Sequence, residues 1–237
     1  MIQYKKYYMP GTKEELLKTI DTIDCTYDIL AGGTDLYAKE KTPFNGADAA
    51  IDISGIKEFS VIKLKKEEGL ITFGSNICIQ QFLEEKVLME NVPILRHAAI
   101  YFADQQIREM ATVGGNVANS SPSGDTIAPL TALEAVIHTI TSKDNKICEK
   151  ETPITEFITG VGKNLLEKAT PNPYILNILK EYGCAFKKVG LRRSLCISTA
   201  SSAFLVKADA SKTHFEDVRI AFGAIGPVPR RMMEIED

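Results

Sequence analysis

A stretch of small polar residues, 111–129, carries the side chains best suited to hold a polar ligand. It reads ATVGGNVANSSPSGDTIAP. Gly114 and Gly115 lack side chains, so we expect their N–H groups to approach a phosphate or a sugar closely. Asn116 offers a donor and an acceptor, and the Asp125 carboxylate suits a ribose or ribityl hydroxyl. A small-residue loop without a ligand is the alternative, and a lone Gly-Gly pair would favour it.

A second glycine pair lies in residues 31–36, which read AGGTDL. It follows a predicted strand and precedes a short helical stretch, where free N–H groups and the helix dipole would both face an anion. The segment is neither a GxGxxG motif nor a P-loop, and alone it indicates only a turn. Two such loops favour a dinucleotide ligand, because its pyrophosphate and its sugars need separate binding segments.

Catalysis by side chains is not indicated anywhere in the sequence, and we predict no catalytic residue. His97, His138 and His214 are far apart and have no acid or nucleophile at a recognisable spacing. The five cysteines form no CxxC pair, which predicts reduced thiols and no metal site in this chain. The basic group at residues 187–193 is interpreted as a solvated turn or, alternatively, as cations beside an anionic cofactor.

The elements that must position the two glycine loops begin with a βαβ-like unit. Thr12 and Glu15 match a capping box in front of a helix, and strands are predicted at residues 4–9, 25–30 and 49–53. A hairpin, three helices and a strand are then expected, in order, at 61–73, 79–88, from Pro93, 127–133 and 136–141.

From Pro171 onward, short turns separate strand-like runs and no long helix intervenes. These runs, at 174–179, 185–189, 197–206 and 218–224, predict an antiparallel sheet. We therefore divide the chain into an N-terminal subdomain (1–57), a second α/β subdomain (58–170) and a C-terminal sheet domain (171–237).

Composition excludes several classes of partner. The chain has 237 residues, 44% hydrophobic and 25% charged, and a formal net charge of −3, so no strong field attracts nucleic acid. We find no apolar run long enough to span a bilayer, and the first residues lack a signal-peptide core. A cytoplasmic protein without membrane or nucleic-acid partners is expected.

Four segments in this order resemble the FAD-binding (medium) subunit of molybdenum hydroxylases, the xanthine dehydrogenase family. They are AGGTDL (31–36), ATVGGNVANSSPSGDTIAP (111–129), FITGVGKNLL (157–166) and AFKKVGLRR (185–193). The resemblance implies an α+β fold, with a two-part PCMH-type (vanillyl-alcohol-oxidase-like) FAD-binding domain. A small domain with a three-stranded antiparallel sheet, similar to the C-terminal domain of the CO dehydrogenase flavoprotein, would follow. Family members continue further, so we expect that domain to be shortened here at Asp237.

The resemblance also implies roles for individual residues. Residues 30–36 would wrap the FAD pyrophosphate through backbone N–H groups, Asp125 would bind a sugar hydroxyl, and Phe102 would pack against the cofactor. Leu166 would lie near the adenine, and Lys187 would reach the flavin edge or its chain. The implied cofactor-binding residues are Leu30, Ala31, Gly32, Gly33, Thr34, Asp35, Leu36, Phe102, Ala111, Thr112, Gly115, Asn116, Ala118, Asn119, Asp125, Leu166 and Lys187.

The function implied is electron transfer within a hetero-oligomer. FAD would bind this chain, with molybdopterin on a large subunit and [2Fe–2S] clusters on a small subunit. Electrons would leave to NAD⁺ or another acceptor, and the substrate would be chosen at the molybdenum site of the large subunit. A stand-alone flavin oxidoreductase of the same superfold and a non-enzymatic assembly scaffold are the alternatives.

Overall fold

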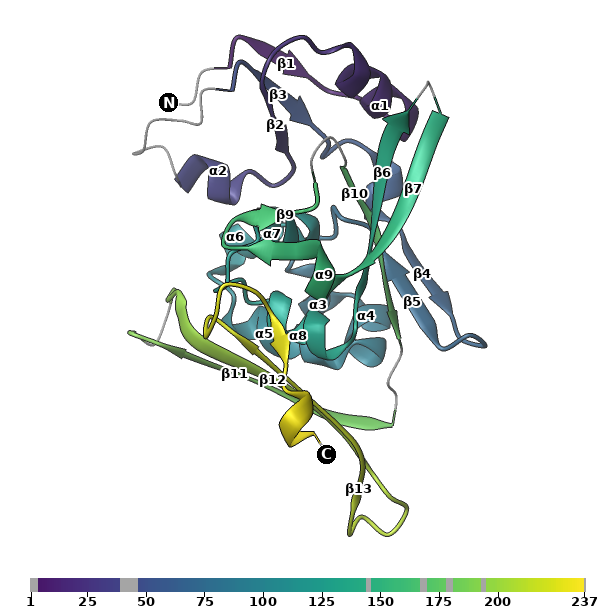
Figure 1. Ribbon diagram of the computed structural model, residues 1–237, viewed down its shortest axis with the longest axis vertical. Helices are drawn as coiled ribbons and strands as arrows, with labels where there is room; N and C mark the ends of the chain where they lie inside the picture. Colours follow the sequence, from purple (N-terminus) through teal and green to yellow (C-terminus); the bar gives the residue numbers. More distant parts are fainter. Residues whose placement is uncertain are drawn as a thin grey trace.

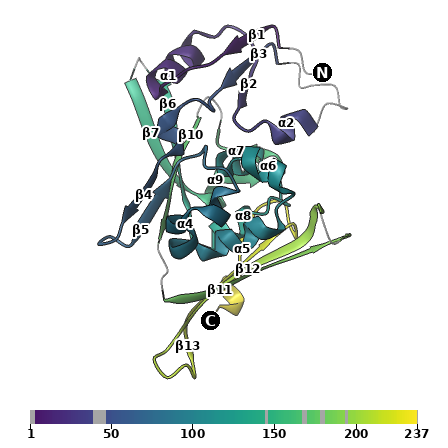
Figure 2. The same ribbon diagram turned by 180° about the vertical axis from the view of Figure 1, so that it is seen from behind.

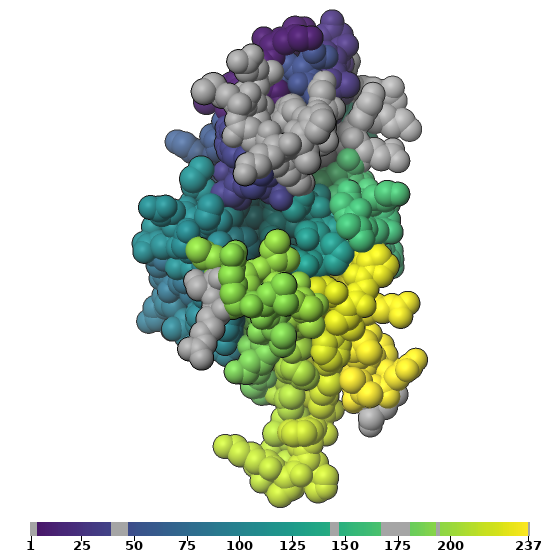
Figure 3. Space-filling model, turned by 90° about the vertical axis from the view of Figure 1, so that its left-hand side faces the viewer, coloured from purple at the N-terminus to yellow at the C-terminus, as the bar shows by residue number. Residues whose placement is uncertain are grey.

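The described residues form a three-stranded, a five-stranded and a four-stranded sheet and a two-stranded hairpin, with helices between them. The structure is a computed structural model that describes residues 4–38, 47–143, 146–166, 170–177, 181–192 and 195–236. An N-terminal unit, a central body and a C-terminal sheet follow one another along the long axis, from purple through teal to yellow (Figures 1 and 3). This order places the two glycine segments on facing parts of the molecule.

The N-terminal unit is the predicted βαβ-like arrangement. Its elements are β1 (Lys6–Tyr8), α1 (Lys13–Thr22), β2 (Tyr27–Leu30), α2 (Thr34–Ala38) and β3 (Ala49–Asp52). The strands are parallel in the order β1-β3-β2. Thr12 Oγ1 accepts from the Glu15 N–H at 3.2 Å, and the Glu15 carboxylate accepts from the Gly11 N–H at 2.7 Å, so one first-turn donor and the N–H just before the cap are satisfied. β2 thus ends shortly before Gly32 and Gly33 and positions them at the end of the sheet.

A five-stranded antiparallel sheet forms one side of the central body (Figure 2). Its strands, in spatial order, are β4 (Ile62–Lys65), β5 (Leu70–Phe73), β10 (Thr170–Asn177), β6 (Val136–Lys143) and β7 (Lys146–Pro153). The predicted hairpin at 61–73 is confirmed as β4 and β5.

The domain boundary predicted at residue 171 is wrong. The run at 174–179 was assigned to the C-terminal sheet, but β10 pairs with β5 and β6 in the central body. The Pro171-Asn172-Pro173 break that suggested a boundary is a register shift inside β10, between Pro171 and Tyr174. Proline is tolerated at such irregularities because no ladder N–H is needed there. Residues 178 and 179 lie outside the described residues.

Short helices fill the other side of the central body. They are α3 (Gln81–Glu84), α4 (Lys86–Asn91), α5 (Pro93–Tyr101), α6 (Gln105–Met110), α7 (Val113–Asn119), α8 (Ile127–Ala132) and α9 (Ile154–Phe157), with the 3₁₀ turn η1 (Lys57–Ser60). The helix predicted at 79–88 is divided by Glu85, whose ψ of 111° is extended. The two glycines that we placed in a loop at 111–129 lie in α7, because Thr112 caps a helix that includes both. The helix predicted at 127–133 is confirmed as α8.

The C-terminal sheet contains the three long antiparallel strands expected and a fourth short one. They are β11 (Tyr182–Gly190), β12 (Ser198–Ala208), β13 (Phe215–Gly223) and β14 (Arg230–Arg231), followed by the 3₁₀ turn η2 (Met233–Ile235). Phe186, Leu205 and Ala221 join the same hydrophobic core as α5 and α8. The sheet therefore packs as part of one continuous body with the central helices.

A small hairpin, β8 (Ile158–Gly160) and β9 (Lys163–Asn164), lies beside α7. The Asn164 amide donates to the Ala118 carbonyl at 2.7 Å, so the hairpin is tied to the end of α7. Within the described ranges, no helix is long and apolar enough to cross a membrane.

Candidate functional site

A cavity of about 440 Å³ lies between the N-terminal unit and the helices of the central body. Fourteen of the seventeen predicted site residues line it. They are Ala31, Gly32, Gly33, Thr34, Asp35, Leu36, Phe102, Ala111, Thr112, Gly115, Asn116, Ala118, Asn119 and Leu166. The fold thus brings the two glycine segments, some eighty residues apart in the sequence, to one ligand-sized space.

The first wall of the cavity is the turn from β2 into α2. A Cβ on Gly32 would lie 1.7 Å from the Met110 carbonyl oxygen, so this turn touches the end of α6 backbone to backbone. Gly33 has a φ of +68°, a conformation that side chains disfavour. α2 begins at Thr34, and Thr34, Asp35 and Leu36 line the cavity, so the N-terminal end of this short helix borders the ligand space.

The second wall is the start of α7, and its glycines differ from our prediction. The Gly114 N–H donates to the Ser75 carbonyl at 2.9 Å, and the Gly115 N–H donates to Thr112 Oγ1 at 3.0 Å. Both donors that we expected to face a phosphate therefore have protein acceptors. A Cβ on Gly114 would lie 2.6 Å from the Ser75 Cβ, so this glycine is required for packing against the loop after β5.

That loop, with Ser75 and Asn76, is a third wall that sequence reasoning missed. Ser75 Oγ and Asn76 Oδ1 are buried and have no hydrogen-bond partner among the residues described. Buried polar atoms are nearly always paired, so these two oxygens leave polar capacity unused in residues that line the cavity. A signal existed, because Gly74-Ser75-Asn76 follows a strand just as the other glycine segment does. The remaining missed lining residues are Asp28, Ile29, Ala38, Ile53 and Ile107, and Gly114, which we expected at the ligand, also lines the cavity.

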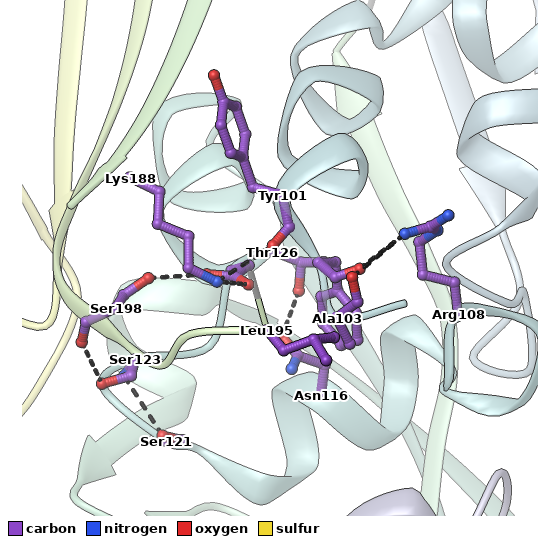
Figure 4. A network of polar contacts seen from close by, with 12 residues as sticks. Tyr101, Ala103, Arg108, Asn116, Ser121, Ser123, Thr126, Lys188, Leu195 and Ser198 are labelled. Atoms are coloured by element: carbon purple, nitrogen blue, oxygen red, sulfur yellow. Dashed lines mark hydrogen bonds and ion pairs between the residues drawn. The ribbon is translucent and has the colours of Figure 1, made fainter. Parts of the chain in front are cut away.

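Three predicted residues do not line the cavity, and Asp125 is the most informative. Its carboxylate accepts from Lys188 Nζ at 2.6 Å and from Ser198 Oγ at 2.9 Å. Figure 4 shows Lys188 and Ser198 converging from two strands of the C-terminal sheet. The side chains of Lys188 and Asp125 are 4% and 8% exposed. The carboxylate predicted to bind a sugar hydroxyl is instead half of a buried ion pair.

Burial raises the pKa of the Asp125 carboxyl, and the hydrogen bond and charge of Lys188 oppose that shift. Strand alternation places Lys187 and Lys188 on opposite faces of β11. Side chains of β11 point alternately to its two faces, and Lys187 is exposed while Lys188 points inward with Phe186. Leu30 is buried at the end of β2 and does not line the cavity, and its backbone contact to the pyrophosphate stays a prediction.

Polar contacts hold two further lining residues in place. Thr126 Oγ1 donates to Asn116 Oδ1 at 2.7 Å, which leaves the Asn116 amide nitrogen available to the cavity side. Asn164 Oδ1 accepts from the Leu166 N–H at 2.8 Å and so fixes Leu166 at the edge of the cavity. Both residues are positioned by neighbours that do not line the cavity themselves.

The histidines stay outside the site. His138 Nε2 lies 2.9 Å from a Glu151 carboxylate oxygen on the neighbouring strand, and His214 lies in an exposed turn. Burial lowers the pKa of His97, which lies beside Cys184 under the C-terminal sheet. Across the part of the chain that the structure describes, no three His, Cys, Asp or Glu side chains are grouped to hold a metal ion.

The cavity therefore offers backbone N–H groups, short hydroxyl and amide side chains and two unpaired buried oxygens. Its described lining includes the carboxylates Asp28 and Asp35 but no lysine or arginine, so an anionic ligand would depend on backbone donors. Hydroxyl and N–H groups of a ligand would satisfy the two unpaired oxygens. This donor set fits a dinucleotide with sugar hydroxyls and a pyrophosphate.

Comparison with known proteins supports the same class of ligand. The family described as "FAD binding domain in molybdopterin dehydrogenase" matches residues 2–171. The chain is similar to the glyceraldehyde dehydrogenase medium chain of Sulfolobus acidocaldarius, with 28% identity over 97% of this chain and 79% of that one. It is also similar to the xanthine dehydrogenase FAD-binding subunit of Escherichia coli O157:H7, with 30% identity over 88% and 70%.

Solved structures share the fold. A chain of carbon monoxide dehydrogenase from Hydrogenophaga pseudoflava superposes with a TM-score of 0.88 at 24% identity, over 98% of this chain and 78% of that one. Quinoline 2-oxidoreductase from Pseudomonas putida 86 gives a TM-score of 0.86 at 18% identity, over 98% and 78%. From the family match over most of its length, this chain belongs to the FAD-binding subunits of the molybdopterin dehydrogenases and is a flavoprotein oxidoreductase subunit.

Proposed function

We propose that this chain is the electron-transfer subunit of a multi-subunit molybdenum-dependent dehydrogenase or hydroxylase. A molybdopterin-binding large subunit would oxidise the substrate, and a small subunit with [2Fe–2S] clusters would deliver the electrons to this chain. NAD⁺ or another acceptor would then receive them. The observation that carries the proposal is the cavity between the two glycine segments, with two unpaired buried oxygens, inside the region that the family matches.

FAD, when bound, supplies the redox chemistry of this subunit. The protein contributes binding and orientation. The turn at Gly32 and Gly33 and the first N–H groups of α2 would hold the pyrophosphate, because backbone donors approach it without side-chain interference. Asn116 and the loop of Ser75 and Asn76 would hold polar groups of the sugar or ring.

The buried ion pair of Lys188 and Asp125 suits a supporting role at the edge of the cavity. It joins the C-terminal sheet to Asp125, and the hydroxyl of the next residue, Thr126, holds Asn116. Opposite charges in contact offset one another's burial, so the pair adds little net charge near the ligand. We infer that Lys188 orients this region in place of Lys187.

The finer expectations are proposals too. We propose that residues 4–177 form the two parts of a PCMH-type FAD-binding domain and that the chain functions in the cytoplasm. Relatives named as a medium chain and as a FAD-binding subunit support the presence of partner subunits.

Purification of the tagged chain from the cells that encode it tests the proposal. Two polypeptides are expected to copurify, one that carries molybdopterin and one that carries [2Fe–2S] clusters, as identified by mass spectrometry and metal analysis. Addition of the substrate of the large subunit should bleach the flavin absorbance of the complex. A matched complex with Gly115→Val, which narrows the cavity, should assemble but lose the flavin band and electron transfer to the acceptor.

Two results would favour the alternatives. If the chain, free of partner subunits, turns over a substrate with its own flavin, it is a stand-alone oxidoreductase. If the Gly115→Val complex still assembles and transfers electrons, the cofactor role is wrong and an assembly scaffold remains.

A further inference from the structure

The link between α5 and α6, residues 102–104, has an uncommon backbone conformation and carries an aromatic residue that lines the cavity. Phe102 lines the cavity and caps α5, and Asp104 caps α6 by accepting from the Ile107 N–H at 2.8 Å. Between them, Ala103 has a φ of +36°, which is uncommon for a residue with a side chain. Such a conformation persists only where surrounding contacts hold it.

Two cations hold the carbonyl groups of this link. Arg108 Nη1 donates to the Phe102 carbonyl at 3.0 Å and to the Ala103 carbonyl at 3.4 Å. Lys188 Nζ donates to the Tyr101 carbonyl at 3.2 Å (Figure 4). The last carbonyl groups of a helix receive no hydrogen bond from within the helix, and they lie at the negative end of its dipole. Positive donors on three successive carbonyls therefore fix where α5 ends and how the next residue leaves it.

Arg108 is itself held independently of the cavity. Its Nε donates to Gln80 Oε1 at 2.9 Å, and its carbonyl accepts from the Gln80 N–H at 3.0 Å. The Gln80 amide also donates to Glu84 at 2.7 Å, which orients its oxygen toward the arginine. A guanidinium is a rigid planar fork, so fixing Nε also fixes the direction of Nη1. The described lining of the cavity does not include Arg108.

We propose that Arg108 is a positioning residue of the cofactor site, which sets the place of the Phe102 ring through the two backbone carbonyls it holds. The proposal rests on the proposed function, because it assumes that the cavity binds FAD. Ligand sites need supporting hydrogen bonds behind the residues that touch the ligand, and a ring that shifts loses contact with it.

A double-mutant cycle tests the proposal by separating positioning from general stability. FAD affinity is measured by flavin fluorescence for wild type, Arg108→Met, Phe102→Ala and the double variant. We expect Arg108→Met to weaken FAD binding about tenfold and Phe102→Ala to weaken it by a similar factor. In the Phe102→Ala background, Arg108→Met should change the affinity less than about twofold, because the ring it positions is gone.

The matched control is Arg96→Met, the same substitution at an exposed position of α5, which should leave FAD affinity unchanged. The visible circular dichroism of the bound flavin gives a second readout, and Arg108→Met should shift it toward the Phe102→Ala spectrum. Arg108→Lys, which keeps the charge but not the fork, should fall between wild type and Arg108→Met. If Arg108→Met does not fold, Gln80→Met releases the guanidinium more mildly and enters the same cycle.

An equal loss of affinity from Arg108→Met in both backgrounds would overturn the proposal, since the arginine would then act on the fold as a whole. So would an unchanged affinity and spectrum in Arg108→Met. Failure of the wild type to bind FAD would instead overturn the proposed function, and the wild-type titration shows which has failed.

Discussion

Gly32→Ala should separate the two main walls of the cavity. The added Cβ would lie 1.7 Å from the Met110 carbonyl oxygen and 2.6 Å from its carbon, whereas real Cβ contacts stay above 3.0 Å. The obstacle is backbone on both sides, so no side chain can rotate away, and the walls must move apart by about 1 Å or more. A gap of that size forfeits a quarter to a half of each van der Waals contact across it.

We expect this strain to cost about 2 to 3 kcal/mol, which for a chain of this size lowers the Tm by about 5 to 10 °C. FAD affinity should fall about tenfold to a hundredfold, because donors on the two walls no longer reach one ligand together. Differential scanning fluorimetry and flavin fluorescence titration measure the two effects.

One glycine of the same chain serves as a control. Gly55→Ala meets nothing within 4 Å and should change neither quantity. A Gly32→Ala protein with wild-type Tm and wild-type FAD affinity would refute the close contact of the walls and the reasoning built on it.

Further predictions concern the charged and polar groups around the site. Lys188→Met should destabilise the protein by about 3 to 5 kcal/mol in urea unfolding, because it leaves a buried carboxylate unpaired, while outward-facing Lys187→Met stays within about 0.5 kcal/mol. The Tyr182 hydroxyl holds the pKa of Asp217 below its ordinary value. This contribution is therefore present above about pH 4 and is lost as pH falls through the lowered pKa, and Asp217→Asn should flatten that part of the stability profile. Ser75→Ala should leave the Tm of the FAD-free protein equal or higher, since it removes an unpaired buried hydroxyl, but should weaken FAD binding severalfold in titration.

The sequence was most informative where local signals and chain order agreed. Glycines at the end of a strand required close backbone approach, and the βαβ rhythm of the first residues placed one such pair at the mouth of a sheet. Of the four C-terminal runs predicted as strands, those at 185–189, 197–206 and 218–224 lie in β11, β12 and β13 of one antiparallel sheet. Most of the cavity lining followed from these elements and the family resemblance.

Errors arose where a local pattern admitted two structures. Pro171 and Pro173 mark a break equally well at a domain boundary or at a bulge, and only the pairing of β10 with β5 and β6 decides between them. β7, with the polar sequence KICEKETP, shows little apolar alternation and gave no strand signal. The choice between Lys187 and Lys188 depends on the phase of β11, which a one-residue shift reverses.

The partners of buried charges could not be read from the sequence at all. Asp125 has two polar side chains in contact, Lys188 and Ser198, and both lie more than sixty residues away. A carboxylate near a glycine loop suggests a sugar ligand, but in the folded protein the Asp125 carboxylate is paired with Lys188. The unpaired oxygens of Ser75 and Asn76 likewise became visible only when the strands around them were in place.

The central claim is that the cavity between the two glycine segments binds FAD, and stoichiometric titration tests it most directly. The purified chain is stripped of ligand, titrated with FAD, and followed by flavin fluorescence and by absorbance of the protein fraction after gel filtration. We predict saturation at one FAD per chain, with the binding lost or strongly weakened in Gly32→Ala and kept in Gly55→Ala. A correctly folded chain that takes up no FAD, or one that binds it equally well in both variants, would contradict the account.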